Sequence, residues 1–200
     1  MDAVKTLEEL ESIYDATVPG AITKVSTRIT PLYQQWIDAS RFLILSTIGP
    51  EGTDASPRGD DGPVVQVVDD KTIWLPDWRG NNRLDSLRNI VRDSRVSFMF
   101  MVPGCRNVVR ANGSAILTAD VNATSQFMRN GKRPRTVIVF SVGEVYYQCA
   151  KALMRSGLWI ADDESDRVPT AGQFNKEFIS DLDVTAYDEG YDEYAKERMW

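Results

Sequence analysis

The chain has 200 residues, of which 42% are hydrophobic and 26% charged, a composition ordinary for a globular protein with a proper core. Its formal net charge of -6 argues against a general nucleic-acid binder, because such proteins are usually basic. It contains no histidine, which excludes Ser-His-Asp and Cys-His catalysis and the common histidine-ligated haem, zinc and iron sites.

Helix signals dominate the start of the chain. Residues 4–15 have an acidic amphipathic pattern, and Val18-Pro-Gly20 ends it. Thr30-Pro31 then starts a second helix that runs to about Ser40, with Thr as N-cap and Pro at the first helical position. We expect residues 1–40 to form a helical segment that packs on the following domain.

Short strands bounded by turn signals follow. We expect strands at 41–48, 53–57, 64–68, 72–75, 95–102, 107–117 and 135–147. Gly49-Pro-Glu-Gly52 and Asp69-Asp-Lys71 read as hairpin turns, so the strands beside them pair antiparallel. A doubly wound parallel sheet would need a helix between most strands, and no Gly-x-Gly-x-x-Gly motif follows a strand. The pattern predicts a mainly β, α+β fold, an antiparallel barrel with helices at its rim.

Shorter helices are expected between and after these strands. They cover 82–93, 121–130 with Asp120 as cap, and 149–159. The last part of the chain is acidic and indicates two more helices, near 170–180 and 188–198. We therefore expect the β domain to cover residues 41–160 and an acidic helical tail to cover 161–200.

Neither the cysteines nor the apolar runs indicate an exported or membrane-bound protein. Cys105 and Cys149 cannot form a disulfide framework or a four-cysteine metal site, so we expect free thiols and no metal. The N-terminus lacks the apolar core of a signal peptide, and the longest apolar runs are too short to span a bilayer. These features favour a cytoplasmic protein without membrane contact.

A strand end, a Gly/Asn turn and a helix start meet between Leu75 and Ile90. Asn82 suits the N-cap position, and Asp85 lies three residues later, where a capping box places its acid. The free N–H groups of a helix start, together with Arg79 and Arg83, suit a phosphate. The alternative is a pair of solvated arginines on an ordinary capped helix.

Several motifs occur in order along the chain. They are Ala55-Ser-Pro-Arg-Gly-Asp60, Val67–Asp77, Gly80–Ile90, Val102-Pro-Gly104, Val109–Ala115 and Cys149–Trp159. This set resembles the pyridoxamine 5'-phosphate oxidase-like flavoproteins, the FMN-binding split β-barrel group, in the branch with Ser-Pro-Arg-Gly-Asp and Asn-Asn-Arg-Leu-Asp motifs. The resemblance covers residues 20–165 and implies a homodimer that binds FMN between its subunits and acts on a small molecule.

The resemblance also implies which residues contact FMN. These are Arg83 with Asn82 at the phosphate, where the local charge pattern also places Arg79, Leu75, Pro76 and Asp77 along the ribityl chain and flavin edge, Ser56 and Arg58 on a neighbouring strand, Arg110 near the pyrimidine edge, and Lys151, Arg155 and Trp159 from the partner subunit.

Simpler structural roles remain open for several of these residues. Asn82 can be a cap alone, Arg58 can pair with Asp60 or Asp61, Lys151 and Arg155 can form a solvated basic face, and Trp159 can belong to the core or the dimer interface.

The chain departs from true pyridoxamine phosphate oxidases at its end. It lacks their C-terminal substrate-phosphate residues in matching form, and its acidic tail would repel a phosphorylated substrate. Gln148 also stands where many relatives of this branch have histidine. We therefore expect an FMN-dependent oxidoreductase on an unidentified small molecule, with no catalytic residue assigned and with Arg110 or Lys151 stabilising reduced flavin.

Other functions remain open at this point. One is a non-catalytic FMN carrier or sensor, and another is a split-barrel protein that uses deazaflavin or haem.

Overall fold

One antiparallel sheet forms the centre of the molecule in the computed structural model, which describes residues 1–200. Its seven strands follow the order β2-β1-β5-β6-β7-β4-β3. The strands are β1 Phe42–Gly49, β2 Gly52–Gly59, β3 Gln66–Val67, β4 Thr72–Asp77, β5 Arg95–Met101, β6 Val108–Thr118 and β7 Thr136–Gln148. The predicted α+β class and both predicted hairpins, β1 with β2 and β3 with β4, are confirmed.

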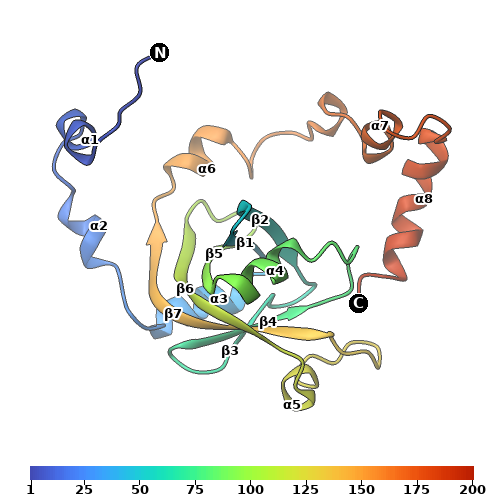
Figure 1. Ribbon diagram of the computed structural model, residues 1–200, viewed down its shortest axis with the longest axis horizontal. Coiled ribbons are helices and arrows are strands. Elements are labelled where there is room, and N and C mark those ends of the chain that lie inside the picture. The colour runs from blue at the N-terminus through green and yellow to red at the C-terminus, as the bar shows by residue number, and fades with distance from the viewer.

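The helices lie at the rim of the sheet and in two arms that extend from it (Figure 1). They are α1 Leu7–Ile13, α2 Pro19–Thr23, α3 Pro31–Ala39, α4 Asp85–Arg92, α5 Val121–Thr124, α6 Lys151–Ser156, α7 Ala171–Lys176 and α8 Val184–Lys196, with a 3-10 helix at Ser165–Arg167. The short helix α2 was not predicted, and α5 and α6 are shorter than predicted. None of the helices combines the length and the apolar character needed to cross a bilayer.

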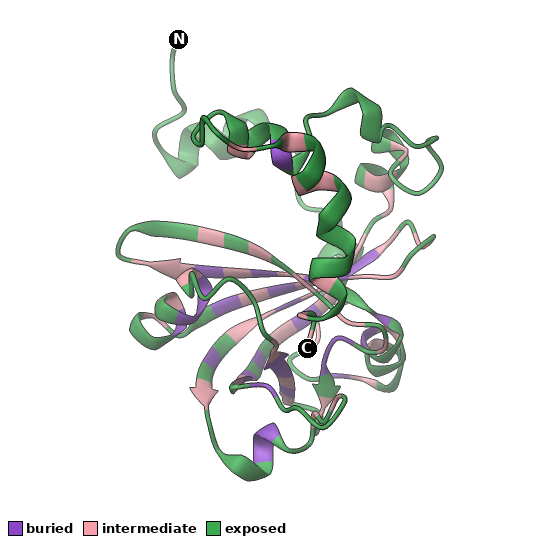
Figure 2. Cartoon of the chain, turned by 90° about the vertical axis from the view of Figure 1, so that its right-hand side faces the viewer, coloured by how far each residue is buried: buried purple, intermediate pink, exposed green.

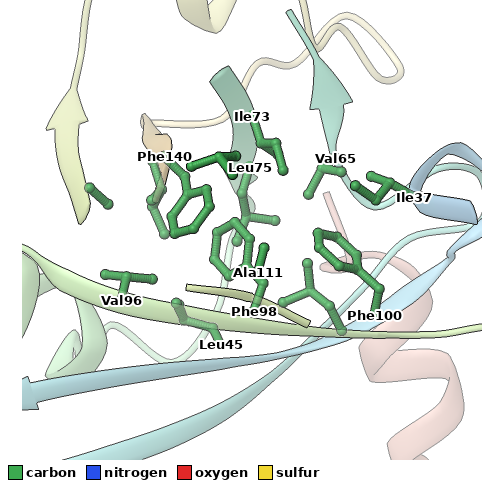
Figure 3. Packing of buried hydrophobic residues seen from close by; sticks show 14 of the residues in the cluster. Ile37, Leu45, Val65, Ile73, Leu75, Val96, Phe98, Phe100, Ala111 and Phe140 are labelled. Atoms are coloured by element: carbon green, nitrogen blue, oxygen red, sulfur yellow. The ribbon is translucent and has the colours of Figure 1, made fainter. Parts of the chain in front are cut away.

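Alternate side chains of the strands build one hydrophobic core (Figure 3). The ring of Phe98 lies 4.4 Å from that of Phe140 and meets Phe100 edge-on at 5.8 Å, measured between centroids. Helix α4 adds Leu87 to this core, and α3 adds the fully buried Ile37. The core therefore fixes α4, and with it the turn that precedes α4.

The sheet curls until its two edge regions meet. Strands β2 and β4 lie near opposite ends of the strand order, yet Nη1 of Arg58 in β2 is 2.7 Å from Oδ1 of Asp77 in β4. No backbone ladder joins the two strands. The result is an open barrel, and we call the line where β2 faces β4 the seam.

The helix beside the seam begins later than predicted. Its N-cap position is Leu84, with a φ of 64° and no side-chain cap bond, and Asn82 also has a positive φ, 59°. Asn81 accepts a hydrogen bond from the N–H of Arg83 through its side chain, at 3.0 Å, which stabilises a turn instead of a helix here. Asn82 is therefore not the N-cap, and Asp85 is not the acid of a capping box.

The tail after β7 is built differently from the barrel. Apart from Gly172, every buried residue lies between Ile29 and Val145 (Figure 2). Helices α7 and α8 are joined by Asp188, whose carboxylate accepts hydrogen bonds from Thr170 Oγ1 at 2.5 Å and from the N–H of Gly172 at 2.8 Å. Local polar contacts, and not a hydrophobic core, hold this part of the chain.

Candidate functional site

The seam opens into a polar cavity of about 640 Å³. Small-molecule sites usually measure about 300–1,000 Å³, so the volume suits a ligand of cofactor size. The cavity is lined by residues 54–58 of β2, by the turn 77–82, by residues 83–87 at the start of α4, and by residues 135–136 before and at the start of β7.

A second cavity of about 350 Å³ continues the first. The two cavities share residues 56–58 and 78–81, and the second one reaches Val64, Leu75 and Pro76. Together they form one groove, which we call the seam groove, with a cationic end in the larger cavity and a second end in the smaller cavity, where Val64, Leu75 and Met199 join the lining.

Arginines gather at the cationic end of the seam groove. Arg79 and Arg135 make no ion pair, whereas Nε of Arg83 lies 2.5 Å from the carboxylate of Asp85. Nη1 of Arg135 donates to Oδ1 of Asn82 at 3.5 Å, which places the guanidinium of Arg135 against the turn. With the N–H groups at the start of α4, this end favours an anionic group.

The Arg58–Asp77 ion pair lies where the two cavities meet. Only 21% and 16% of the two side chains are exposed, so the pair is largely shielded from solvent. The simpler alternative, in which Arg58 pairs with Asp60 or Asp61, is wrong. Arg129 pairs with both of those carboxylates, at 2.9 and 2.6 Å.

Two buried polar atoms beside the groove have no hydrogen-bond partner in the chain. Of the three such atoms in the protein, Nε of Arg58 and Oγ1 of Thr136 belong to residues that line the groove, and only Nε1 of Trp36 lies elsewhere. Buried polar groups are almost always paired, so these two indicate a partner that the chain itself does not supply. The residues fit FMN, which joins an anionic phosphate to a large, mostly apolar ring.

The structure brings most of the predicted site residues together. Ser56, Arg58, Asp77, Arg79, Asn82 and Arg83 line the larger cavity, and Leu75 and Pro76 line the smaller one.

The other predicted residues lie outside the groove of their own chain. The guanidinium of Arg110 packs over the ring of Tyr146 at 5.4 Å, and Trp159 Nε1 donates to the carbonyl of Cys105 at 2.8 Å. Lys151 and Arg155 are both exposed residues of α6. A single chain therefore does not bring these four residues to the seam groove.

Several groove residues were missed at the sequence level. Arg135 and Thr136 reach the groove because Thr136 of β7 pairs with Asp77 of β4, a contact between distant parts of the chain. The basic run from Arg129 to Arg135 is visible in the sequence, but only the pairing of β4 with β7 shows that its end lies at the groove. Trp78 was also missed, although it lines both cavities and donates from Nε1 to Asp60 Oδ2 at 2.9 Å.

Comparisons with known proteins agree with this architecture. The family model described as pyridoxamine 5'-phosphate oxidase matches residues 29–149. A single-substitution variant of HupZ from Group A Streptococcus is 16% identical, and its match covers 60% of this chain and 99% of HupZ with a TM-score of 0.50. This likeness confirms the predicted antiparallel split-barrel fold.

Weaker matches include two further solved structures. General Stress Protein 26 from Bacillus anthracis is 15% identical over 57% of this chain and 88% of its own, with a TM-score of 0.42. A protein described as FMN-binding, from Syntrophomonas wolfei, is 11% identical over 58% of this chain and 88% of its own, with a TM-score of 0.43. No curated protein sequence matches the chain significantly.

Proposed function

Because the chain belongs to the pyridoxamine 5'-phosphate oxidase family, we propose that it binds FMN in the seam groove and acts as an FMN-dependent oxidoreductase on a small molecule. One observation carries the proposal: the groove has unpaired arginines at one end and buried donors of Arg58 and Thr136 without partners along it. This arrangement matches a ligand with a phosphate at one end and a ring with polar edges at the other.

Different residues of the groove bind different parts of FMN. Arg79, Arg83 and Arg135 hold the phosphate through charge-assisted hydrogen bonds, which are roughly twice as strong as neutral ones. Leu75 and Pro76, both buried in β4, form the apolar wall for the ring. When bound, FMN supplies hydride and electron transfer, and the protein supplies orientation and electrostatics.

A second copy of the chain completes the proposed site. In this proposal the partner subunit brings the residues that lie outside the groove of their own chain, namely Arg110, Lys151, Arg155 and Trp159. The sheet offers a surface for dimerisation, because Ile44, Met99 and Met101 alternate with core residues and point to the opposite face, where they are not fully buried. Apolar side chains grouped on one face of a sheet mark an interaction surface.

FMN titration of the purified protein tests the proposal. Each of Arg83→Ala and Arg135→Ala removes a charge-assisted contact with the phosphate, so we expect the Kd for FMN to rise roughly 10- to 100-fold. The matched control is Arg95→Ala, because Arg95 is also an exposed arginine but pairs with Asp93, at 2.6 Å, and lines neither cavity of the groove. A protein that takes up no FMN would overturn the proposal and direct the search to deazaflavin and haem.

A non-catalytic FMN carrier is the second candidate. Each carboxylate of the groove is already engaged: Asp54 with Ser86 Oγ at 2.5 Å, Asp77 with Arg58, and Asp85 with Arg83. With no histidine in the chain, the groove therefore offers no unengaged carboxylate or imidazole for proton transfer. Bound FMN that no nicotinamide or other donor reduces under anaerobic conditions would favour the carrier.

A further inference from the structure

The tail reaches the smaller cavity of the seam groove through Met199. Met199 lines the smaller cavity together with Val64, Leu75 and Trp78. In Figure 1 the chain ends beside the loop that follows β4, after α8 has passed along one side of the barrel. The tail thus supplies one wall of a cavity that is otherwise formed by β2, β4 and the segments that flank β4.

Two basic residues hold the end of the tail at this place. The guanidinium of Arg129 lies 5.8 Å from the ring of Trp200, and Nζ of Lys132 donates to the carbonyl oxygen of Trp200 at 3.3 Å. Arg129 and Lys132 also exchange backbone hydrogen bonds, of 2.9 and 2.8 Å, which fix the turn that carries both. The contact therefore combines a cation–π interaction with a hydrogen bond from a lysine on a well-defined turn.

A chain of polar contacts connects this anchor to the groove. The carboxylate of Asp60, only 4% exposed, accepts hydrogen bonds from Arg129 Nη2 and from Trp78 Nε1, both at 2.9 Å. Arg129 thus touches Trp200 on one side and, through Asp60, orients Trp78 on the other. Because Trp78 lines both cavities, the position of the tail and the shape of the groove depend on the same guanidinium.

We propose that Met199 and Trp200 are cofactor-retaining residues: Met199 is a movable wall against the ring end of bound FMN, Trp200 anchors this wall on the positioning residue Arg129, and together they slow FMN exchange. The inference rests on the proposed function, since it assigns a role in the same groove. The wall is movable because the tail buries only Gly172 and is held mainly by local polar contacts. A thioether is suited to this place, because methionine sulfur packs favourably against aromatic rings.

Hydrogen exchange of the FMN-free protein tests the wall itself. Trp200→Ala removes the ring over Arg129, and we expect the amides of residues 78–81 to exchange about threefold faster, the loss typical of one exposed cation–π contact. Trp200→Phe keeps an aromatic ring and should restore slow exchange. Phe178→Ala is the matched control, because Phe178 belongs to the same tail, is 85% exposed and lines neither cavity.

FMN release tests the retaining role. Trp200→Ala and Met199→Ala should each release FMN about threefold faster and make bound flavin more accessible to iodide, whereas Phe178→Ala should match the wild type. Two results would overturn the inference while FMN binding stands. One is unchanged hydrogen exchange at residues 78–81 in Trp200→Ala, and the other is FMN release at the wild-type rate in both variants. Faster exchange in a protein that takes up no FMN would support the wall and overturn the proposed function.

Discussion

In the barrel, Phe98, Phe100 and Phe140 are fully buried, whereas in the tail Phe174 and Phe178 are 56% and 85% exposed. The barrel depends on the hydrophobic effect acting over strands far apart in sequence. The tail depends on one capping box, at Thr170, and a few hydrogen bonds between neighbouring segments, such as those to Asp188. A ligand site between two such regions has one rigid side and one side that opens at low cost.

The largest expected effect comes from the barrel core. Phe98→Ala should lower the free energy of unfolding by about 3–5 kcal/mol, because it leaves a cavity beside Phe100 and Phe140. Phe178→Ala in the tail should change it by less than about 0.5 kcal/mol. Urea denaturation followed by tryptophan fluorescence measures the free energy of unfolding of both variants. Equal losses would contradict the difference between barrel and tail.

The second largest effect on stability is expected at the ion pair of the seam. Arg58→Ala leaves Asp77 without its partner in a largely shielded place, so we expect a loss of about 1–3 kcal/mol in the free energy of unfolding. The double variant Arg58→Met/Asp77→Leu should recover much of this loss, because it leaves no unpaired charge. A double variant as unstable as the single one would mean that the ion pair itself closes the barrel.

A variant in the tail tests whether the tail and the barrel unfold independently. Asp188→Ala removes the acceptor for Thr170 and Gly172, each hydrogen bond being worth about 0.5–1.5 kcal/mol. We expect faster limited proteolysis between residues 161 and 183 and an unchanged Tm of the barrel. A Tm that falls together with the protease resistance would show one cooperative unit in place of two.

The smallest effect concerns a surface carboxylate where α4 leads into β5. Hydrogen bonds from the side chain and backbone of Arg95 lower the pKa of Asp93 to about 2. Because the folded pKa lies below the unfolded one, the contribution to stability is present above about pH 4 and is lost as the pH falls toward 2. NMR titration should find this low pKa in the wild type and a higher one in Arg95→Ala, and a pKa unmoved by the substitution would contradict the assignment.

The strands and hairpins could be predicted because their signals are local. Alternating apolar residues mark β1 and β5, and Gly49 and Gly52 mark the turn between β1 and β2. The motif residues Arg58 and Arg83 could be assigned to one site for the same reason, since each lies in a short recognisable segment, and both line the larger cavity.

Contacts between distant segments could not be predicted. Asp77 as the partner of Arg58 follows only from the curl of the whole sheet, and Arg135 reaches the groove only through the pairing of β4 with β7. The late start of α4 depends on left-handed backbone at Asn82 and Leu84, which competes with a helix that the residue types favour. The position of Met199 depends on the path of the entire tail.

The seam also has a consequence for association between chains. An open barrel leaves strand edges unpaired, and unpaired edges are the usual starting points of edge-to-edge aggregation. Both strands at the seam carry a proline, Pro57 in β2 and Pro76 in β4, and a proline has no N–H to donate to a foreign strand. The seam that contains the groove is thereby a poor template for a strand from another molecule.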